Sequence, residues 1–417
     1  MSGPLLPKVT VSPTTDGYLV RWEDAALEAT VERIDEKGDG VTAEIRIRSV
    51  LDGGGEMLAP ARVNLMAPQT RRGLARDLAA RDGIYDWDGM LTQLIRGVLD
   101  LHRIGEPEID LRSYSPDLQT RWVLEPFVER GGPTILFADG GTGKSFFAMA
   151  IAVSVSSGRP VVGHLRSEAC PVLYLDWETD ADTVQERIQA IRWAAGISEA
   201  PPIYYRRQSA SLIESSSEIR RIIARRVVGL VVVDSLGAAR GGEPESADLT
   251  IRTFNAARSW GVPWLAVDHV TKAAGNDSTK PFGSAYTPNL SRLTWSMDKA
   301  DEDRASQKVA LVNRKQNNIG RQPSIGYRMI FERDSEDVLV SLAFKQFDLA
   351  ADGDLGRRAS TAERILSSLA SGGKEAGALA VELEASANLI RARLADLQKR
   401  GAVVKKDDLW WLTARGH

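Results

Sequence analysis

The chain has 417 residues, of which 43% are hydrophobic and 26% are charged, and its formal net charge is −3. This length predicts about two or three domains, and the composition is that of a soluble globular protein. The one cysteine excludes a disulfide framework and a Cys-rich metal site, while the small negative charge leaves room for nucleic-acid binding only through a local basic surface. No apolar run reaches the ~18 residues of a membrane span, and the N-terminus lacks the layout of a signal peptide. We therefore expect a cytoplasmic protein that makes no membrane contact.

Residues 1–115 are predicted to form a small α+β domain. Leu27–Ile34 and Val41–Val50 alternate apolar and polar side chains, which indicates half-buried antiparallel strands. Gln69–Arg81 and Trp87–Ile104 are interpreted as helices, since apolar residues in the second recur at helical spacing. No catalytic constellation is visible here. We expect the domain to serve docking or oligomerisation, including contacts with replication or repair proteins.

Residues 116–349 are predicted to form an α/β core, because strands and helices alternate along them. That alternation favours a mostly parallel sheet covered on both faces. The expected parallel strands are Thr134–Phe137, Val172–Asp176, Ile203–Arg206, Leu230–Val233 and Trp264–Val267. The expected helices are Ser145–Ser156, Ala181–Ala195, Ser216–Arg226 and Ser246–Trp260. Four later runs are predicted to add an antiparallel extension: Arg292–Met297, Lys308–Asn313, Gly326–Phe331 and Val338–Ala343.

A phosphate-binding loop is predicted between the first strand and the first helix of this core. Its glycines let successive backbone N–H groups point at an anion, and the helix N-terminus adds partial positive charge. Lys144 would reach the β- and γ-phosphates, and the Ser145 hydroxyl would hold Mg²⁺. Ala138 stands where the general pattern has glycine. The residues expected to bind nucleotide are Asp139, Gly140, Gly141, Thr142, Gly143, Lys144, Ser145 and Phe146.

The loop thus predicts ATP and Mg²⁺ as cofactors. The alternative is a glycine-rich turn with an unrelated lysine, which the flanking strand and helix disfavour.

Polar side chains follow three strands of the predicted sheet, at the edge where parallel sheets bind ligands. Asp234 would bind Mg²⁺ through water. Either Asp176 or Glu178 would orient the attacking water, and we favour Glu178 because it lies beyond its strand; the alternative is that Glu178 caps the next helix. His269 is predicted to sense the γ-phosphate, with Asp268 orienting it or sharing the outer shell of the metal, although a lone histidine is often structural.

Arg314 and Lys315 end a later strand of the core. In a ring they would reach the γ-phosphate of the neighbouring subunit as a trans-acting finger. The alternative is a solvated basic pair.

Four stretches of this core resemble motifs of the RecA superfamily. They are the loop Ala138–Ser145 and the strand ends Tyr174–Glu178, Val231–Ser235 and Asp268–Lys272. More closely they are similar to the RepA-type branch, which includes plasmid and phage hexameric helicases related to the DnaB group. The resemblance covers about residues 118–346.

This resemblance implies a RecA-like fold, Glu178 as the catalytic glutamate and His269 as the sensor. It also implies a hexameric ring that acts on single-stranded DNA. The late basic motif of the family is similar to residues 313–318, where Asn317 replaces the arginine of DnaB-like sequences. Arg314 or Lys315 would then take its role.

Two loops are predicted to hold single-stranded DNA at the centre of such a ring. One spans residues 237–246 and carries Arg240, and the other spans residues 271–281 and carries Lys272 and Lys280. Their charges would neutralise phosphates in a salt-dependent way. The alternative is that both are ordinary surface loops.

Residues 350–359 are small, polar and glycine-bearing, and they predict a linker. Residues 360–417 then predict a winged helix-turn-helix. Its helices are expected at Thr361–Ala370, Lys374–Leu383 and Ser386–Arg400, before a hairpin at Val403–Leu412. Arg391 and Arg393 of the third helix would meet duplex DNA in the major groove, although many such domains bind protein instead.

The sequence as a whole therefore predicts an α/β protein. It has a RecA-like P-loop core with a mostly parallel sheet, flanked by a small N-terminal α+β domain and a C-terminal winged helix-turn-helix. We expect a Mg²⁺-dependent ATPase that couples ATP hydrolysis to binding of and translocation on single-stranded DNA, as a RepA-like replicative helicase and a hexameric homo-oligomer. One alternative is a repair or recombination mediator, or a helicase loader, that does not unwind DNA. Another is an ATP-switched DNA-binding regulator.

Overall fold

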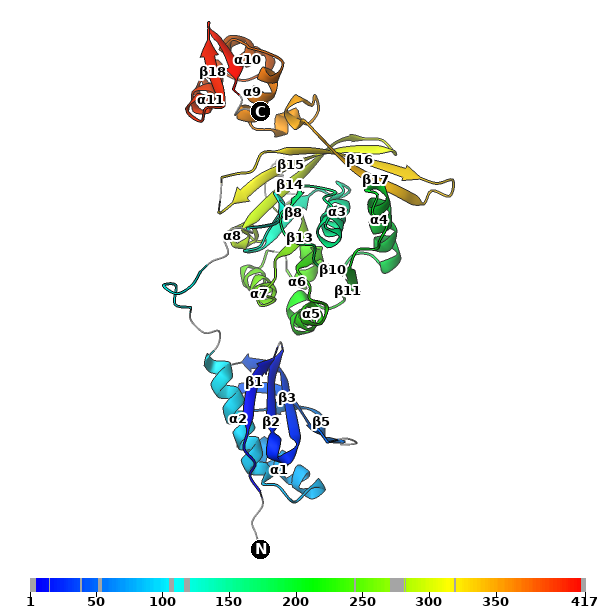
Figure 1. The fold of residues 1–417 in the computed structure, drawn as a ribbon, viewed down its shortest axis with the longest axis vertical. Coiled ribbons are helices and arrows are strands. Elements are labelled where there is room, and N and C mark those ends of the chain that lie inside the picture. Colours follow the sequence, from blue (N-terminus) through cyan, green and yellow to red (C-terminus); the bar gives the residue numbers. More distant parts are fainter. Residues whose placement is uncertain are drawn as a thin grey trace. The chain divides into compact units, whose positions relative to one another are not determined.

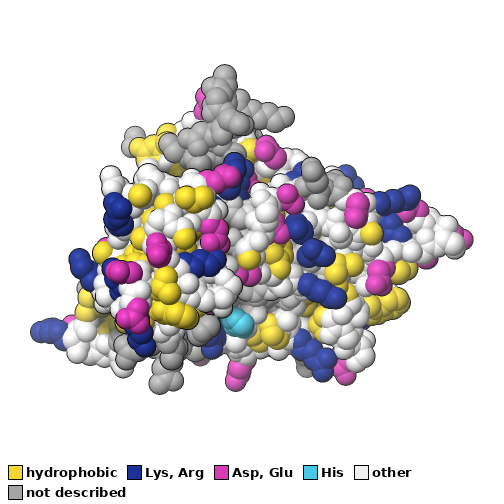
Figure 2. Space-filling model, turned by 90° about the horizontal axis from the view of Figure 1, so that it is seen from above, with side chains coloured by type: hydrophobic (Ala, Val, Ile, Leu, Met, Phe, Trp, Pro, Cys, Tyr) yellow, Lys and Arg dark blue, Asp and Glu magenta, His cyan; other side chains and the backbone are white. Residues whose placement is uncertain are grey.

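A computed structural model describes residues 5–14, 16–37, 40–51, 55–104, 109–115, 121–243, 245–270, 281, 283–318 and 320–413. The chain divides into two compact units, Met1–Asp117 with Ser217–Ala224, and Leu118–Ser216 with Arg225–His417. Figure 1 shows their helices and strands. On the face drawn in Figure 2, Lys and Arg side chains are interspersed with Asp and Glu, in keeping with the small net charge. Among the described residues, no helix combines the length and the apolar character that crossing a membrane requires.

The N-terminal unit contains an antiparallel five-stranded sheet in the order β1-β2-β3-β4-β5 and two helices. The strands are β1 (Thr10–Thr14), β2 (Gly17–Trp22), β3 (Leu27–Lys37), β4 (Gly40–Ser49) and β5 (Glu56–Asn64). The helices are α1 (Pro68–Arg81) and α2 (Trp87–Ile104). Trp22, Ile45, Trp87 and Leu94 are buried in one apolar core, which confirms the predicted alternation along the strands and the helical spacing in α2.

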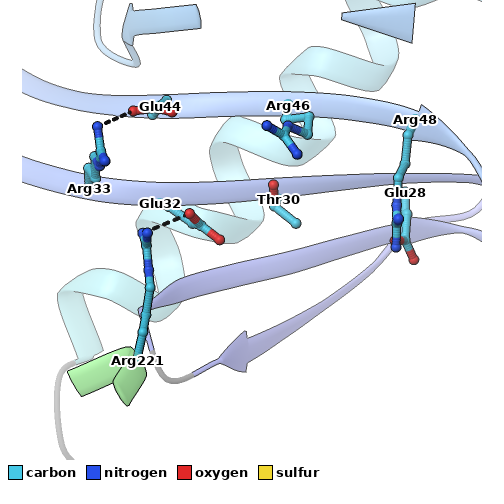
Figure 3. Close-up of a pocket in the computed structure, with 8 residues that line it drawn as sticks. All are labelled: Glu28, Thr30, Glu32, Arg33, Glu44, Arg46, Arg48 and Arg221. Atoms are coloured by element: carbon cyan, nitrogen blue, oxygen red, sulfur yellow. Dashed lines mark hydrogen bonds and ion pairs between the residues drawn. The ribbon is translucent and has the colours of Figure 1, made fainter. Parts of the chain in front are cut away.

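The other face of β3 and β4 carries charged side chains of both signs (Figure 3). Arg33 pairs with Glu44 at 3.1 Å, and the Nε of Arg48 donates to Glu28 at 2.7 Å. An exposed pair such as Arg33 with Glu44 contributes only about 0.2–1 kcal/mol, whereas the Glu28 side chain is buried.

The second unit is built on a nine-stranded sheet in the order β11-β10-β12-β13-β8-β14-β15-β16-β17. The strands are β8 (Thr134–Ala138), β10 (Val172–Asp176), β11 (Ile203–Arg207), β12 (Leu230–Asp234), β13 (Trp264–His269), β14 (Leu293–Glu302), β15 (Ser306–Gln316), β16 (Ile325–Arg333) and β17 (Leu339–Phe347). The helices are α3 (Lys144–Ser157), α4 (Ala181–Ala194), α5 (Leu212–Arg226), α6 (Leu236–Arg240), α7 (Ala247–Arg258) and α8 (Tyr286–Leu290). All the strands and helices predicted for the core are present, and α6 and α8 are additional.

In this spatial order, the strands from β11 through β14, which include β10 and β8, pair in parallel. The remaining pairs, from β14 with β15 to β16 with β17, are antiparallel. Every residue of β10 and β12 is buried, as expected of parallel strands covered on both faces. One prediction was wrong in part, because β14 was expected to belong to the antiparallel extension. It pairs in parallel with β8, Leu293 facing Thr134, since the connection after β13 returns the chain to the same edge.

A small sheet lies beside the large one. Strand β6 (Trp122–Glu125) pairs with β7 (Val128–Glu129) and with β9 (His164–Leu165). Trp122, Val123 and Leu124 are buried in the apolar core of the large sheet. The stretch before the first core strand therefore packs on the core.

The C-terminal part contains three helices and a hairpin at the predicted positions. They are α9 (Thr361–Ala370), α10 (Ala376–Glu382), α11 (Ala387–Lys399), β18 (Val403–Lys406) and β19 (Leu409–Leu412). Ser360 and Glu363 form a reciprocal capping box at the start of α9, and Ile365, Leu379 and Ile390 share a separate apolar core. Within the predicted linker, Leu355 and Ala359 are buried against Ala310, so this stretch is packed rather than open.

Candidate nucleotide site

The predicted phosphate loop connects β8 to α3. Gly141 and Gly143 have φ angles of 70° and 90°, a left-handed conformation that glycine adopts readily and other residues rarely do. A Cβ at Gly143 would also come within 2.6 Å of the Cε of Met329 on β16. At these two positions, therefore, the glycines are required by the geometry of the loop.

Lys144 lies at the first turn of α3 and is only 7% exposed. Its Nζ donates to the carbonyl oxygens of Ala138 at 3.0 Å and Asp139 at 2.8 Å. Burial lowers the pKa of Lys144, and the carboxylates of Asp234 and Glu178 act against that shift. The ammonium group is thus held across the loop, where a phosphate would replace the two carbonyl partners.

Asp234 ends β12 at the carboxyl edge of the sheet and is buried. Its carboxylate accepts hydrogen bonds from the Tyr174 hydroxyl at 2.6 Å and from the Ser145 side chain, while burial raises its pKa. A buried carboxylate beside a serine hydroxyl is the donor set that a phosphate loop offers to Mg²⁺.

Within the described residues, no group of three or more His, Cys, Asp or Glu side chains is placed to hold a metal ion by itself. Mg²⁺ fits these residues only as an ion that also takes phosphate oxygens and water as ligands. We therefore expect it to bind together with the nucleotide.

Asp176 and Glu178, left open as alternatives by the sequence, have different surroundings. Asp176 is buried, and its carboxylate accepts from the backbone N–H groups of Glu178 at 2.9 Å and Thr179 at 3.1 Å. It also accepts from the hydroxyls of Thr179 at 2.7 Å and Tyr205 at 3.1 Å. These four bonds occupy the carboxylate and fix the turn that carries Glu178.

Glu178 is half exposed and faces the loop. Its Oε1 accepts a hydrogen bond from the Ser235 hydroxyl and lies 3.8 Å from the Nε2 of His269. These interactions, that with His269 first, lower the pKa of Glu178 to about 2. The carboxylate is therefore ionised at neutral pH, as a group that orients or activates water must be.

The structure brings most of the residues predicted for the nucleotide site to one hollow of about 190 Å³. Predicted residues that line it are Gly140, Gly141, Gly143, Lys144, Ser145, Phe146, Glu178, Asp234 and His269. Thr142 stands within the loop and donates to the Asp139 carbonyl at 2.8 Å. The hollow lies at the carboxyl ends of β8, β12 and β13, where parallel sheets bind ligands.

Arg187 also lines this hollow, and sequence reasoning missed it. It lies on α4, and its guanidinium carbon is 4.8 Å from the centre of the Phe146 ring, which meets Phe331 edge-on at 5.5 Å. A single arginine on an amphipathic helix carries no sequence signal that separates it from a surface charge. In the structure it is a second cation beside the phosphate loop.

Arg240 does not lie on an exposed loop, so its predicted DNA contact is wrong. The chain after β12 forms α6, and the Arg240 side chain is 0% exposed. Its Nη2 donates to the Thr287 hydroxyl at 2.7 Å and lies 3.3 Å from the Asp268 carboxylate. Burial raises the pKa of Asp268 to about 6 and lowers that of Arg240. The arginine therefore balances a buried carboxylate, which also accepts the N–H of His269 at 2.9 Å.

Arg314 and Lys315 lie on β15, away from the hollow formed by their own chain. The Nε of Arg314 donates to the Ser296 hydroxyl at 2.8 Å. The Nζ of Lys315 donates to the carbonyls of Pro288, Asn289 and Ser291 at 2.7–2.9 Å. Lys315 is thus committed to the end of α8, which argues against its predicted role as a finger.

Of the other four residues predicted to contact DNA, the structure describes two. Lys272 and Lys280 lie outside the described residues. Arg391 and Arg393 are exposed on α11, and Arg393 lies 3.4 Å from Asp396. Their predicted contact with duplex DNA stays a prediction.

Residues 107–275 match the family model of an AAA domain. A solved structure of a KaiC-like protein from the hyperthermophilic archaeon Pyrococcus horikoshii is 13% identical, with a TM-score of 0.37, and the match covers 57% of this chain and 100% of the other. That likeness is too low to support an argument about function. No curated protein matches the chain. The phosphate loop, the acidic strand ends and the AAA match together support a P-loop ATPase domain in this part of the chain.

Proposed function

We propose that this protein is a Mg²⁺-dependent ATPase with a RecA-like core that couples ATP hydrolysis to binding of and translocation on single-stranded DNA. The observation that carries the proposal is the convergence of Lys144, Glu178, Asp234 and His269 on one hollow beside the phosphate loop. These residues come from three separate strand ends and one helix, so their meeting depends on how the strands are ordered in the sheet.

Each group has a chemical role in this proposal. The loop N–H groups and Lys144 bind the phosphates, and Asp234 and Ser145 hold Mg²⁺, which would offset phosphate charge. Glu178 is ionised and orients the attacking water. His269 lies beside Glu178, so loss of the γ-phosphate would change the surroundings of both side chains.

Coupling to DNA is supported by the way the His269 strand end is anchored. Asp268 is tied through Arg240 to α6 and to Thr287 on α8, which lie on either side of residues 271–280 in the chain. Lys272 and Lys280 belong to that segment, which lies outside the described residues. We propose that this segment contacts the DNA.

We further propose that the protein forms a homo-oligomeric, hexameric ring in the cytoplasm, as a replicative helicase. Arg314 is then the residue that reaches the nucleotide of the neighbouring subunit, since Lys315 is committed to α8. The N-terminal unit would contact replication or repair proteins. The C-terminal part would be a winged helix-turn-helix whose Arg391 and Arg393 meet duplex DNA.

ATP turnover with and without single-stranded DNA tests the proposal. Wild-type protein should turn over ATP faster on DNA, and Lys144→Ala should lose nucleotide affinity in calorimetry. Strand displacement then separates a helicase from a loader or mediator. Slow turnover that DNA does not change, or unchanged nucleotide affinity in Lys144→Ala, would overturn the proposal.

A further inference from the structure

A second hollow, of about 360 Å³, lies at the opposite edge of the large sheet. Its lining includes residues that directly precede β8, β13 and β14, such as Pro133, Val262 and Arg292. These strands are parallel, so their amino ends share one edge, whereas the nucleotide site lies at their carboxyl ends. This hollow is therefore separate from the ATPase site.

Three arginines line this hollow, Arg130, Arg258 and Arg292, and we call it the arginine hollow. All three side chains belong to exposed residues, and no Asp or Glu is among the lining residues. In the part of the chain that the structure describes, none of the three forms an ion pair; Arg258 donates to the neutral Asn255 side chain at 3.1 Å. Arg252, on the same helix α7, lies instead 3.8 Å from Asp248.

The acidic residue next to Arg130 in the chain does not line the hollow. Glu129 is 1% exposed, and its carboxylate accepts from the side-chain amides of Gln316 at 2.8 Å and Asn318 at 3.0 Å. Burial and the charge of Arg292 lower the pKa of the nearby Lys315. No carboxylate is among the residues that line the hollow, so a ligand there would meet the three guanidinium groups directly.

The lining also restricts what the hollow can recognise. Phe254 and Trp264 belong to it, but each is only 2% exposed, so neither ring offers a face for base stacking. The Arg292 side chain lies against the backbone of Gly132, where a Cβ would come within 2.3 Å of its Cγ. Guanidinium groups present planar pairs of donors that match phosphate oxygens. These features favour contact with phosphates rather than with bases.

We propose that the arginine hollow binds phosphate groups of a nucleic-acid strand independently of its sequence. The inference rests on the proposed function for its partner, single-stranded DNA, and adds a contact surface at the edge of the sheet opposite the nucleotide. A nucleic-acid strand bound there would lie at the amino ends of β8, β13 and β14, at the edge of the sheet opposite the nucleotide site.

The test measures binding of labelled oligothymidylate to the full chain by fluorescence anisotropy between about 50 and 200 mM salt. The test variant carries Arg130→Gln, Arg258→Gln and Arg292→Gln together, and the matched control is Arg252→Gln on the same helix. Each lost phosphate contact should reduce the salt slope by about 0.7, so the triple variant should lose about 2. The control should keep the wild-type slope, and thermal melting checks that both variants fold.

ATP turnover without DNA should be unchanged in the triple variant, because none of its three arginines lines the nucleotide hollow. A triple variant with the wild-type salt slope would overturn the inference, and if DNA still stimulates its turnover the proposed function stands. If instead DNA leaves wild-type turnover unchanged while the slope falls as expected, the proposed function fails and the inference stands.

Two further results would also overturn the inference. One is wild-type protein that does not bind the oligonucleotide. The other is a labelled polyglutamate peptide that binds wild type as tightly as the DNA does and loses that affinity in the triple variant. The second result would assign the hollow to an acidic protein segment.

Discussion

Asp176 and Glu178 are two acidic residues on one turn, and their hydrogen bonds and surroundings differ. Asp176 is saturated by four hydrogen bonds and cannot take up water without losing one of them. Glu178 faces the phosphate loop, and its lowered pKa keeps it ionised. Of the two carboxylates, that of Glu178 is therefore the one that lines the nucleotide hollow.

Glu178→Gln should lower ATP turnover by about 10²–10⁴-fold, because the amide cannot accept a proton from water. Nucleotide affinity, measured by calorimetry, should stay within a few-fold of wild type since the phosphate loop is intact. Asp176→Asn serves as the comparison, and there we expect loss of stability together with loss of activity. A Glu178→Gln variant with wild-type turnover would show that another group orients the water.

Arg240 is the other residue whose role depends on burial. Removing one member of a buried ion pair leaves an uncompensated charge, which typically costs about 3–5 kcal/mol. Arg240→Ala should lower the free energy of unfolding by that amount, measured by urea denaturation. Arg240→Met combined with Asp268→Leu should cost less, because it removes both charges. A single variant as stable as wild type would contradict a buried pair.

At the scale of elements, α8 shows how a short helix is held in place. It has five residues, and the carbonyls of its last turn accept from the Lys315 ammonium group on β15. Groups at a helix end need such partners when the helix itself cannot supply them. Lys315 thus connects the antiparallel strands to the segment that returns the chain to β14.

Lys315→Met should lower the free energy of unfolding by about 1.5–3 kcal/mol, the usual contribution of hydrogen bonds to a charged group. ATP turnover per folded subunit should be close to wild type. The comparison is Arg314→Met, which should lose turnover if Arg314 is the trans-acting residue. A Lys315→Met protein that is fully stable but inactive would indicate that Lys315 is the trans-acting residue.

At the scale of the whole molecule, the proposed ring requires each active site to combine residues from two neighbouring subunits. Lys144→Ala removes the phosphate ligand of a subunit, and Arg314→Ala removes what that subunit offers to its neighbour. Each variant alone should be inactive. In a mixed ring, about a quarter of the heterologous interfaces would combine an intact Lys144 with an intact Arg314.

Mixing the two variants should therefore restore part of the ATP turnover, measured against equal amounts of each variant alone. If Arg314 acts within its own subunit, no active site in the mixture is complete and turnover stays at background. Sedimentation with a non-hydrolysable nucleotide would show in the same samples whether the subunits assemble.

Much of the core followed from the sequence, for physical reasons that act locally. The strands of the sheet are short apolar runs, and the helices carry apolar residues at helical spacing, so both were visible in the printed chain. The phosphate loop needed glycines at positions 141 and 143, where the backbone is left-handed. Parallel strands end at one edge, so the sequence also predicts that Glu178, Asp234 and His269 converge.

Only the tertiary structure decided which of several plausible partners each polar group has. The sequence predicts Arg240 as a loop cation, whereas in the structure it contacts Thr287, 47 residues away, and Asp268, 28 residues away. The direction of β14, the bonds of Lys315 and the arginine hollow likewise depend on segments far apart in the chain. Local patterns determine elements through short-range sterics and hydrophobic periodicity, whereas burial and charge pairing depend on which distant segments meet.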